Sequence, residues 1–313
     1  MILNIEQGKD LTLSSLWVTR EDRAVTEESR VPTSTIPTLR QRRLGAELRR
    51  LREHAGLTSS AAAELLGVRQ AQISSIESGR YAVSADRVRT FARAYQCADQ
   101  PLVDALASMT GGRTRGWWDE YRDHLPVGLI DLAELEHYAT ALRVALVIHI
   151  PALLQTTDHA RALFRGGIPP FQQYEVEHRL THRIKRQGIL HRESPTPYTA
   201  TIHEAALRMG YGGRDVAVAQ LRHILDMSEL PHVTVRVVPF GRESFHGTGQ
   251  GIDYVVGAVP RLDTVQLDTH HGCEFLDGEA QLGKYRAVID HMEESALDAD
   301  DSRDLILGII RDL

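Results

Sequence analysis

Apolar residues recur at helical spacing through four consecutive segments near the start of the chain, and short polar breaks separate these segments. The first segment repeats leucine at Leu44, Leu48 and Leu51, which places the three side chains on one face of a helix. The four predicted helices span residues 39–55, 59–66, 69–78 and 85–95, and a fifth spans 101–109. The pattern therefore predicts a small all-α domain at residues 38–110.

The second and third of these helices flank the turn Gly67-Val68, which gives the rhythm of a helix-turn-helix. Thr58 is a natural N-cap for the second helix. In the third helix, Ile73 and Ile76 lie three residues apart on one buried face. The small polar residues between them then point outward, as a helix in the major groove of DNA requires.

A different pattern follows Cys97. The sequence GGRTRG at residues 111–116 predicts a linker, and the chain from Trp117 onward alternates short apolar runs with amphipathic segments. Strands are predicted at 144–150, 199–202, 233–238, 252–256 and 265–267, and helices at 155–164, 174–190, 216–227, 280–292 and 303–311. We therefore expect a multidomain protein: an all-α helix-turn-helix N-terminal domain plus a mixed α/β C-terminal domain at residues 117–313. Residues 1–37, rich in Pro, Thr and Ser near their end, are predicted to be a mostly disordered extension.

Charge separates the two predicted domains. Residues 38–95 carry 11 arginines and 5 acidic residues, whereas residues 96–313 carry 21 basic and 31 acidic residues. Only the segment with the helix-turn-helix is therefore suited to a polyanion. No apolar run reaches the roughly 18 residues of a membrane span, and the N-terminus lacks a signal core. We expect a cytoplasmic protein without a membrane partner, associated with the nucleoid when it is bound to DNA.

Affinity and sequence choice are expected to come from different residues. Arginines such as Arg43, Arg69 and Arg80 are suited to phosphates, and Gln70 and Gln72 are the candidate base readers because glutamine pairs with adenine through two hydrogen bonds. The predicted interface with double-stranded DNA comprises Arg43, Thr58, Ser59, Arg69, Gln70, Ala71, Gln72, Ser74, Ser75 and Arg80. A homodimer that reads two half-sites about one helical turn apart is the usual arrangement.

The stretch GLTSSAAAELLGVRQAQISSIESGR, from Gly56 to Arg80, resembles the Cro/C1-type (XRE) helix-turn-helix. The sequence departs from that family at three positions. Ser59 stands where the family often has a glutamine that braces the DNA contact, and Ala62 replaces a usual leucine. Arg69 replaces the Ser/Thr cap of the recognition helix, which costs about 1 kcal/mol of local stability. These departures affect fine specificity rather than DNA binding.

The second half also resembles a known family, the C-terminal domain DUF5753 (Scr1-type, antitoxin-like) found behind XRE motifs in many actinobacterial regulators. The segments that carry the resemblance are RGWWDEYRDHLP (115–126), PALLQTTDHARAL (151–163), HRLTHRIKRQGIL (178–190) and LRHILDMSELPHVTVRVVPF (221–240). The resemblance implies a regulator, often encoded beside a small DUF397 partner protein.

Metal-capable residues gather at Thr269–Glu274, which reads THHGCE and follows Asp268. His246, His203 and His149 are the histidines that could join them in space, but C-x-x-C and H-E-x-x-H spacings are absent. Ser244 near His246 lacks a G-x-S-x-G elbow. We therefore expect no metal, no cofactor and no catalytic site. Two cysteines, Cys97 and Cys273, argue against a disulfide framework.

Three aromatic residues, Trp117, Trp118 and Tyr121, directly follow the predicted linker. They either anchor the second domain against the first or line a pocket for an effector or partner. Three function classes follow from the sequence. The favoured one is a transcriptional regulator whose C-terminal domain senses a small-molecule effector or a small protein. The alternatives are an antitoxin-like protein that sequesters a small DUF397-type partner and autoregulates, and an enzyme with a retained DNA-binding module.

Overall fold

The computed structural model describes residues 36–111, 116–242, 250–269 and 271–313. The following description concerns the unit Pro37–Leu313. The extension predicted for residues 1–37 lies almost wholly outside the described residues, as do residues 112–115 of the predicted linker and the Ser244–His246 pair.

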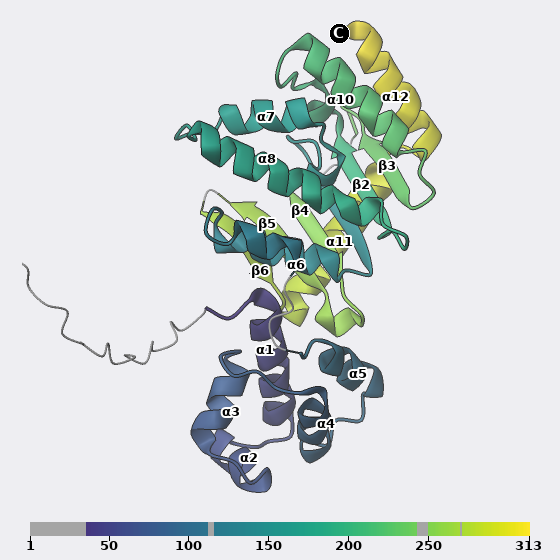
Figure 1. The fold of residues 1–313 in the computed structure, drawn as a ribbon. Coiled ribbons are helices and arrows are strands. Elements are labelled where there is room, and N and C mark those ends of the chain that lie inside the picture. Colours follow the sequence, from purple (N-terminus) through teal and green to yellow (C-terminus); the bar gives the residue numbers. More distant parts are fainter. Residues whose placement is uncertain (1–35, 112–115, 243–249, 270) are drawn as a thin grey trace, which may run out of the picture. The chain divides into compact units, whose positions relative to one another are not determined.

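Five helices form from residues 39 to 108, all of them described (Figure 1). They are α1 (Leu39–His54), α2 (Ser59–Leu65), α3 (Gln70–Glu77), α4 (Ala85–Ala94) and α5 (Gln100–Ser108). Polar side chains cap every one of these helices except α3 by accepting a main-chain N–H, and the caps are Thr38, Thr58, Ser84 and Asp99. The predicted helix boundaries differ from these by one residue at most.

The apolar stripes seen in the sequence form the core of this helical part. Leu44, Leu48 and Leu51 of α1 are buried together with Ile73 and Ile76 of α3. Each such side chain contributes about 1.5–3 kcal/mol by leaving water. The predicted core face of the third helix is therefore confirmed.

A six-stranded sheet forms the centre of the second half, in the order β3-β2-β1-β4-β5-β6. The strands are β1 (Ala141–Leu146), β2 (Tyr198–His203), β3 (Val233–Val238), β4 (Ile252–Val256), β5 (Thr264–Thr269) and β6 (Gly272–Leu276). Strand β2 runs parallel to both β1 and β3, whereas β4, β5 and β6 add antiparallel to the β1 edge. The sheet is mixed and helices surround it, as the predicted α/β class requires.

Neighbouring side chains on the strands point into two different cores. Val144 packs in the larger cluster with residues of β2, β3 and the helices around them, whereas the next residue, Ala145, packs with Ile289 and Met292 of α11. This alternation follows from the two-residue repeat of a strand. The sheet therefore separates two apolar layers.

Helices of the second half pack around this sheet, and α7 and α8 run side by side (Figure 1). The α-helices are α6 (Val127–His137), α7 (Thr157–Arg165), α8 (Gln173–Gln187), α9 (Glu204–Arg208), α10 (Arg214–Met227), α11 (Glu279–Ser295) and α12 (Ala299–Asp312). Single 3₁₀ turns occur at η1 (Trp117–Tyr121), η2 (Ala152–Leu154), η3 (Gly188–Leu190) and η4 (Pro260–Leu262).

The strand predicted at residues 144–150 was wrong in its position. The strand β1 spans Ala141–Leu146 and begins before the apolar run. The apolar pattern missed this start because the charged residue Arg143 lies within the strand. The Arg143 guanidinium lies 2.6 Å from Asp290 and 2.9 Å from Glu293, both on α11. These carboxylates let a charged residue occupy a sheet position that the apolar pattern by itself excludes.

The sequence pattern missed α6 and β6. Helix α6 has no continuous polar face, because Asp131, Glu134 and Glu136 are all buried within the fold. Glu136, for example, accepts two hydrogen bonds from Arg186 on α8, at 2.7 and 2.8 Å. Tertiary partners of this kind remove the amphipathic signal on which helix prediction depends.

Candidate nucleic-acid interface

Helices α2 and α3 are joined by a short turn that a glycine makes possible. Gly67 has φ +63°, in the left-handed region that favours glycine. Leu66 and Val68, on either side, pack against the helical core. The turn therefore fixes α3 against α2 while one face of α3 stays open to solvent.

The open face of α3 carries the residues that the sequence predicts as readers. Gln70, Ala71 and Ser74 are exposed, and Gln72 and Ser75 are partly exposed. The Gln70 amide nitrogen donates to Ser59 Oγ at 3.1 Å and to Ser74 Oγ at 3.3 Å. The structure thus brings these five α3 residues together with the first residue of α2.

Ser59 has a structural explanation in this contact. In the related helix-turn-helix sequences a glutamine often braces the DNA contact from this position, and here Ser59 supports Gln70 directly. Because both amide hydrogens point to hydroxyl groups, the Gln70 carbonyl oxygen is left to accept from a base. Adenine and cytosine offer the matching N–H₂ donor in the major groove.

Thr58 lies beside this face and has a defined local role. Its side chain accepts a hydrogen bond from Ala61 N at 3.1 Å and so caps α2. The helix α3 has no such cap, because Arg69 stands at its N-cap position and makes no side-chain capping bond. In the first turn of α3 the N–H of Gln72 donates to Arg69 O, which leaves those of Gln70 and Ala71 for an anion. The side chains of Arg69 and Arg80, at the two ends of the helix, are exposed as well.

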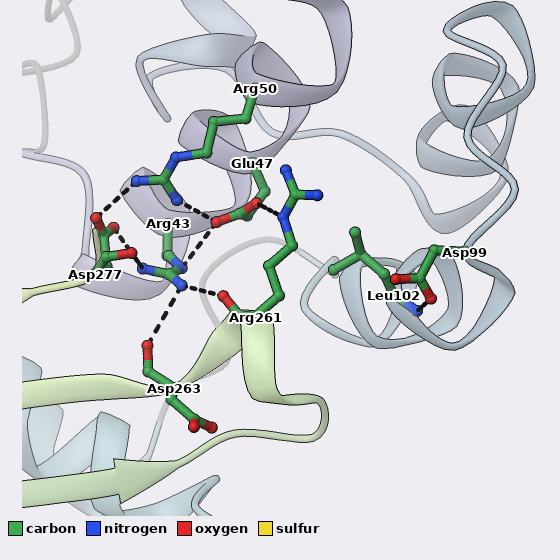
Figure 2. A network of polar contacts seen from close by, with 8 residues as sticks. All are labelled: Arg43, Glu47, Arg50, Asp99, Leu102, Arg261, Asp263 and Asp277. Carbon is green, nitrogen blue, oxygen red and sulfur yellow. Dashed lines mark hydrogen bonds and ion pairs between the residues drawn. The ribbon is translucent and has the colours of Figure 1, made fainter. Parts of the chain in front are cut away.

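Arg43 does not lie on this surface, which corrects its predicted role as a phosphate contact. Its side chain is only 6% exposed. It donates to the main-chain oxygen of Arg261 at 2.5 Å and lies 2.6 Å from the Asp277 carboxylate, both in the second half of the chain (Figure 2). The prediction failed because the arginine-rich start of α1 faces the second half of the chain in the folded protein. Burial there lowers the pKa of Arg43 to about 10.

Two carboxylates organise the network around Arg43 (Figure 2). Glu47 is fully buried, and its carboxylate pairs with Arg43 at 3.4 Å, with Arg261 at 3.0 Å and with Arg50. Asp277 also binds Arg50, at 2.8 Å. Arg43 and Arg50 of α1 thus pair with Asp277, and Glu47 of α1 pairs with Arg261, all across to the second half of the chain.

Arg42, one residue earlier on α1, also pairs with a carboxylate of the second half of the chain. Its guanidinium lies 2.9 Å from the buried Asp131 carboxylate of α6, and the other oxygen of Asp131 accepts from Leu39 N at 3.0 Å. Several arginines that give the N-terminal segment its positive charge are therefore engaged within the molecule. Sequence counting alone overestimates the charge offered to DNA.

The pair Arg52 and Glu77 holds the recognition helix in place, and its role was not predicted. Arg52 donates to both carboxylate oxygens of Glu77, at 2.6 and 2.9 Å, and to Leu57 O at 2.7 Å. This pair joins α1 to the end of α3. The sequence signal was the Glu77 of the helix-turn-helix pattern, but its partner lies 25 residues away.

Gly45 allows α1 and α3 to approach closely, which the sequence also left unassigned. A Cβ atom at this position would lie 2.5 Å from Glu77 O and 2.6 Å from Ile76 O. Only glycine fits without a shift of the backbone of α3.

Two helices, an intervening tight turn and an outward polar face on the second helix define a helix-turn-helix DNA-binding protein. A family model for a helix-turn-helix domain matches residues 43–106. A model described as domain of unknown function (DUF5753) matches residues 129–308, more than half of the chain, and the chain therefore belongs to the DUF5753 family. No curated protein and no solved structure gave a match. The actinobacterial origin and the small partner protein stay predictions.

The three aromatic residues after the linker lie in a packed cluster. Trp118 and Tyr121 are 2% and 6% exposed, and Trp117 is partly buried. Their rings contact His137 and His182 at centroid distances between 5.0 and 5.4 Å. Neither Trp118 nor Tyr121 has the exposure of a residue that lines an open pocket. The cluster lies within the second half of the chain, because its partners are residues 125–138 and His182, so anchoring against the first domain stays a prediction.

The remaining candidate chemistry is spread through the fold. Residues Thr269–Glu274 contain the turn between β5 and β6, and His270 there lies outside the described residues. Within the described parts of the chain, no three His, Cys, Asp or Glu side chains come together as a metal site. Cys97 and Cys273 are both free thiols. No helix in the described ranges is long and apolar enough to cross a bilayer.

Proposed function

We propose that this protein is a sequence-specific transcriptional regulator and not an enzyme. The observation that carries the proposal is the open face of α3, where Gln70 and Gln72 lie between the exposed arginines Arg69 and Arg80. Such a face combines groups that read bases with groups that neutralise phosphates. A protein with this function acts in the cytoplasm, at the nucleoid.

The regulator is proposed to act as a homodimer. One recognition helix covers only a few base pairs of one half-site, and a two-fold dimer doubles the contacts at a spacing of about 34 Å. Sedimentation with and without a palindromic site tests this point. A single protein chain on each bound duplex would contradict it.

The C-terminal domain is proposed to control the DNA-binding half. The contacts of Arg43, Arg50 and Arg42 with Asp277 and Asp131 support this view, because they connect α1 to the DUF5753 region. A signal that changes these contacts changes the position or rigidity of α1, on which α3 packs. The regulator thereby gains a physical route from one half to the other.

The DNA-binding proposal is tested with sites selected from a random duplex library by the full-length protein. We expect Gln70→Ala with Gln72→Ala to abolish the sequence preference while weak, salt-dependent binding persists. Gln281→Ala, an exposed glutamine on α11, is the matched control and should leave binding unchanged. If no sequence is enriched at low salt, the regulator proposal fails.

A further inference from the structure

A cavity of about 150 Å³ lies where α1 and α5 meet α6 and the end of β4. A cavity of this size accommodates one benzene ring. It touches both the helical part of the chain and the sheet domain, and all of its walls belong to described residues. A molecule bound there would contact both parts at once.

The walls are mainly apolar. Ala105 and Met109 come from the end of α5, Leu135 from α6, and Val255 and Phe275 from the sheet. These side chains provide no hydrogen-bonding atom, so they suit the apolar body of a ligand.

One acidic group in the wall lacks an ion-pair partner. Glu134 is 6% exposed, and among the residues that the structure describes no cationic side chain lies within 4.0 Å of its carboxylate. Burial raises the pKa of Glu134, and the neighbouring Thr38 side chain and Arg40 charge oppose this shift. The other two acids of the wall, Asp131 and Asp277, are paired with arginines. Glu134 is therefore the carboxylate that still has acceptor capacity.

A cation of the protein already lines the cavity. The Arg40 guanidinium lies 3.9 Å from the ring centroid of Tyr138 and donates to Ser108 O at 3.0 Å. It also attracts Glu134 electrostatically. The site thus combines a carboxylate with an aromatic face, the two groups that together favour an organic cation.

We propose that this cavity binds a small amine, with one protonated nitrogen on an apolar body about the size of an aromatic ring. The ammonium pairs with Glu134 and competes with Arg40 for the face of Tyr138, and the body fills the space between Leu135, Met109 and Val255. Since Arg40 belongs to α1, its displacement loosens the contact of α1 with Tyr138 and Ser108. The regulatory meaning of this exchange rests on the proposed function, whereas the binding itself does not.

The test uses the full-length protein without DNA and isothermal titration with benzylamine, which is protonated at neutral pH. Benzyl alcohol has the same shape without the charge. We expect saturable binding of benzylamine, and binding of the alcohol at least about tenfold weaker, because a charge-assisted hydrogen bond contributes on that order.

Three variants test whether the ligand binds in this cavity. Glu134→Gln should remove the preference for the amine, and Arg40→Ala should tighten amine binding because the competing cation is gone. Ala105→Leu fills part of the space without a change of charge and should weaken both ligands alike. Equal binding of amine and alcohol, or amine binding that none of the three variants changes, would overturn the proposal. Absence of saturable amine binding to both the wild type and Arg40→Ala overturns it as well.

The same ligand series then separates this proposal from the DNA-binding one. If benzylamine binds in the cavity but the protein shows no sequence preference on DNA, the ligand site is supported and the regulator proposal fails. If the protein binds DNA with sequence preference but does not bind benzylamine, the regulator proposal is supported and the ligand site fails.

Discussion

The guanidinium of Arg43, on the first helix of the DNA-binding part, lies 2.6 Å from the carboxylate of Asp277, which directly follows the last strand of the sheet. Arg43 stands in the arginine-rich start of α1, where the sequence predicts a contact with DNA phosphate. In the folded chain it joins α1 to the DUF5753 region instead. Arg43, which the sequence placed on the DNA-binding surface, therefore links α1 to the DUF5753 region within the molecule.

Replacing Arg43 by alanine is expected to lower stability and to leave the DNA surface intact. The change removes one cationic partner from the fully buried Glu47, which keeps Arg50 and Arg261, so the cost should stay below the about 3 kcal/mol of a buried charge left unpaired. Urea unfolding measures the loss. The slope of log affinity against log salt should not change, whereas a lost phosphate contact would reduce it by about 1. Arg165→Ala, an exposed arginine on α7, serves as the control.

The pair Arg52–Glu77 is expected to contribute far more to stability than a neighbouring pair on the same helix. The side chains of Arg52 and Glu77 are 8% and 10% exposed, whereas those of Arg49 and Glu53 are 62% and 50% exposed. We expect Glu77→Ala to cost about 3 kcal/mol, whereas Glu53→Ala should change stability far less because its pair is exposed to water. Double-mutant cycles with Arg52→Ala and Arg49→Ala isolate the two pair energies. Similar energies for both would show that burial does not decide them.

Alanine at Gly45 should destabilise the helix-turn-helix, although alanine is the better helix former. The added Cβ would lie 2.5 Å from Glu77 O, and such overpacking costs about 1–3 kcal/mol. Gly283, on α11, has nothing within 4 Å of the same added atom. Gly283→Ala should therefore raise stability by about 0.5–1 kcal/mol. Thermal unfolding of both variants gives the answer, and a stabilising Gly45→Ala would refute the close approach of α1 and α3.

The pH dependence of stability should contain a contribution from Asp253. Burial, together with the neighbouring Asp268 carboxylate, raises the pKa of Asp253 to about 7. The unfolded chain has a value near 3.9. The folded state therefore binds the extra proton between about pH 4 and pH 7, and the stability associated with it is lost as pH rises through this window.

Asp253→Asn removes this titration. Compared with the wild type, the variant should gain stability progressively from pH 4 to pH 7 and keep a constant advantage above that. Urea unfolding at pH 4, 5.5, 7 and 8 measures the difference. Asp123→Asn, at an exposed position, provides the reference. A difference between Asp253→Asn and the wild type that does not vary with pH would show that the Asp253 carboxyl is not perturbed.

The local structure of the DNA-binding half follows from short-range signals in the sequence. Leucines and isoleucines at helical spacing, glycines at breaks, and Thr58 and Ser84 at cap positions act over a few residues, so α1 to α5 were predicted to within one residue. The outward face of α3 follows from the same periodicity. It places Ala71, Ser74 and Ser75 opposite Ile73 and Ile76, with Gln70 at the edge of that face, whatever the rest of the chain does.

The roles of the charged residues, in contrast, depend on tertiary contacts. Arg43, Arg52 and Arg143 look alike in the sequence, yet each pairs with a carboxylate from a distant segment, namely Asp277, Glu77 and Glu293. Helix α6 was missed in the sequence pattern for the same reason, because its buried acids Asp131 and Glu136 also pair with arginines from distant segments. Apolar burial follows from local periodicity, whereas an ion pair depends on which segments the fold brings within about 4 Å, and that distance is a property of the whole chain.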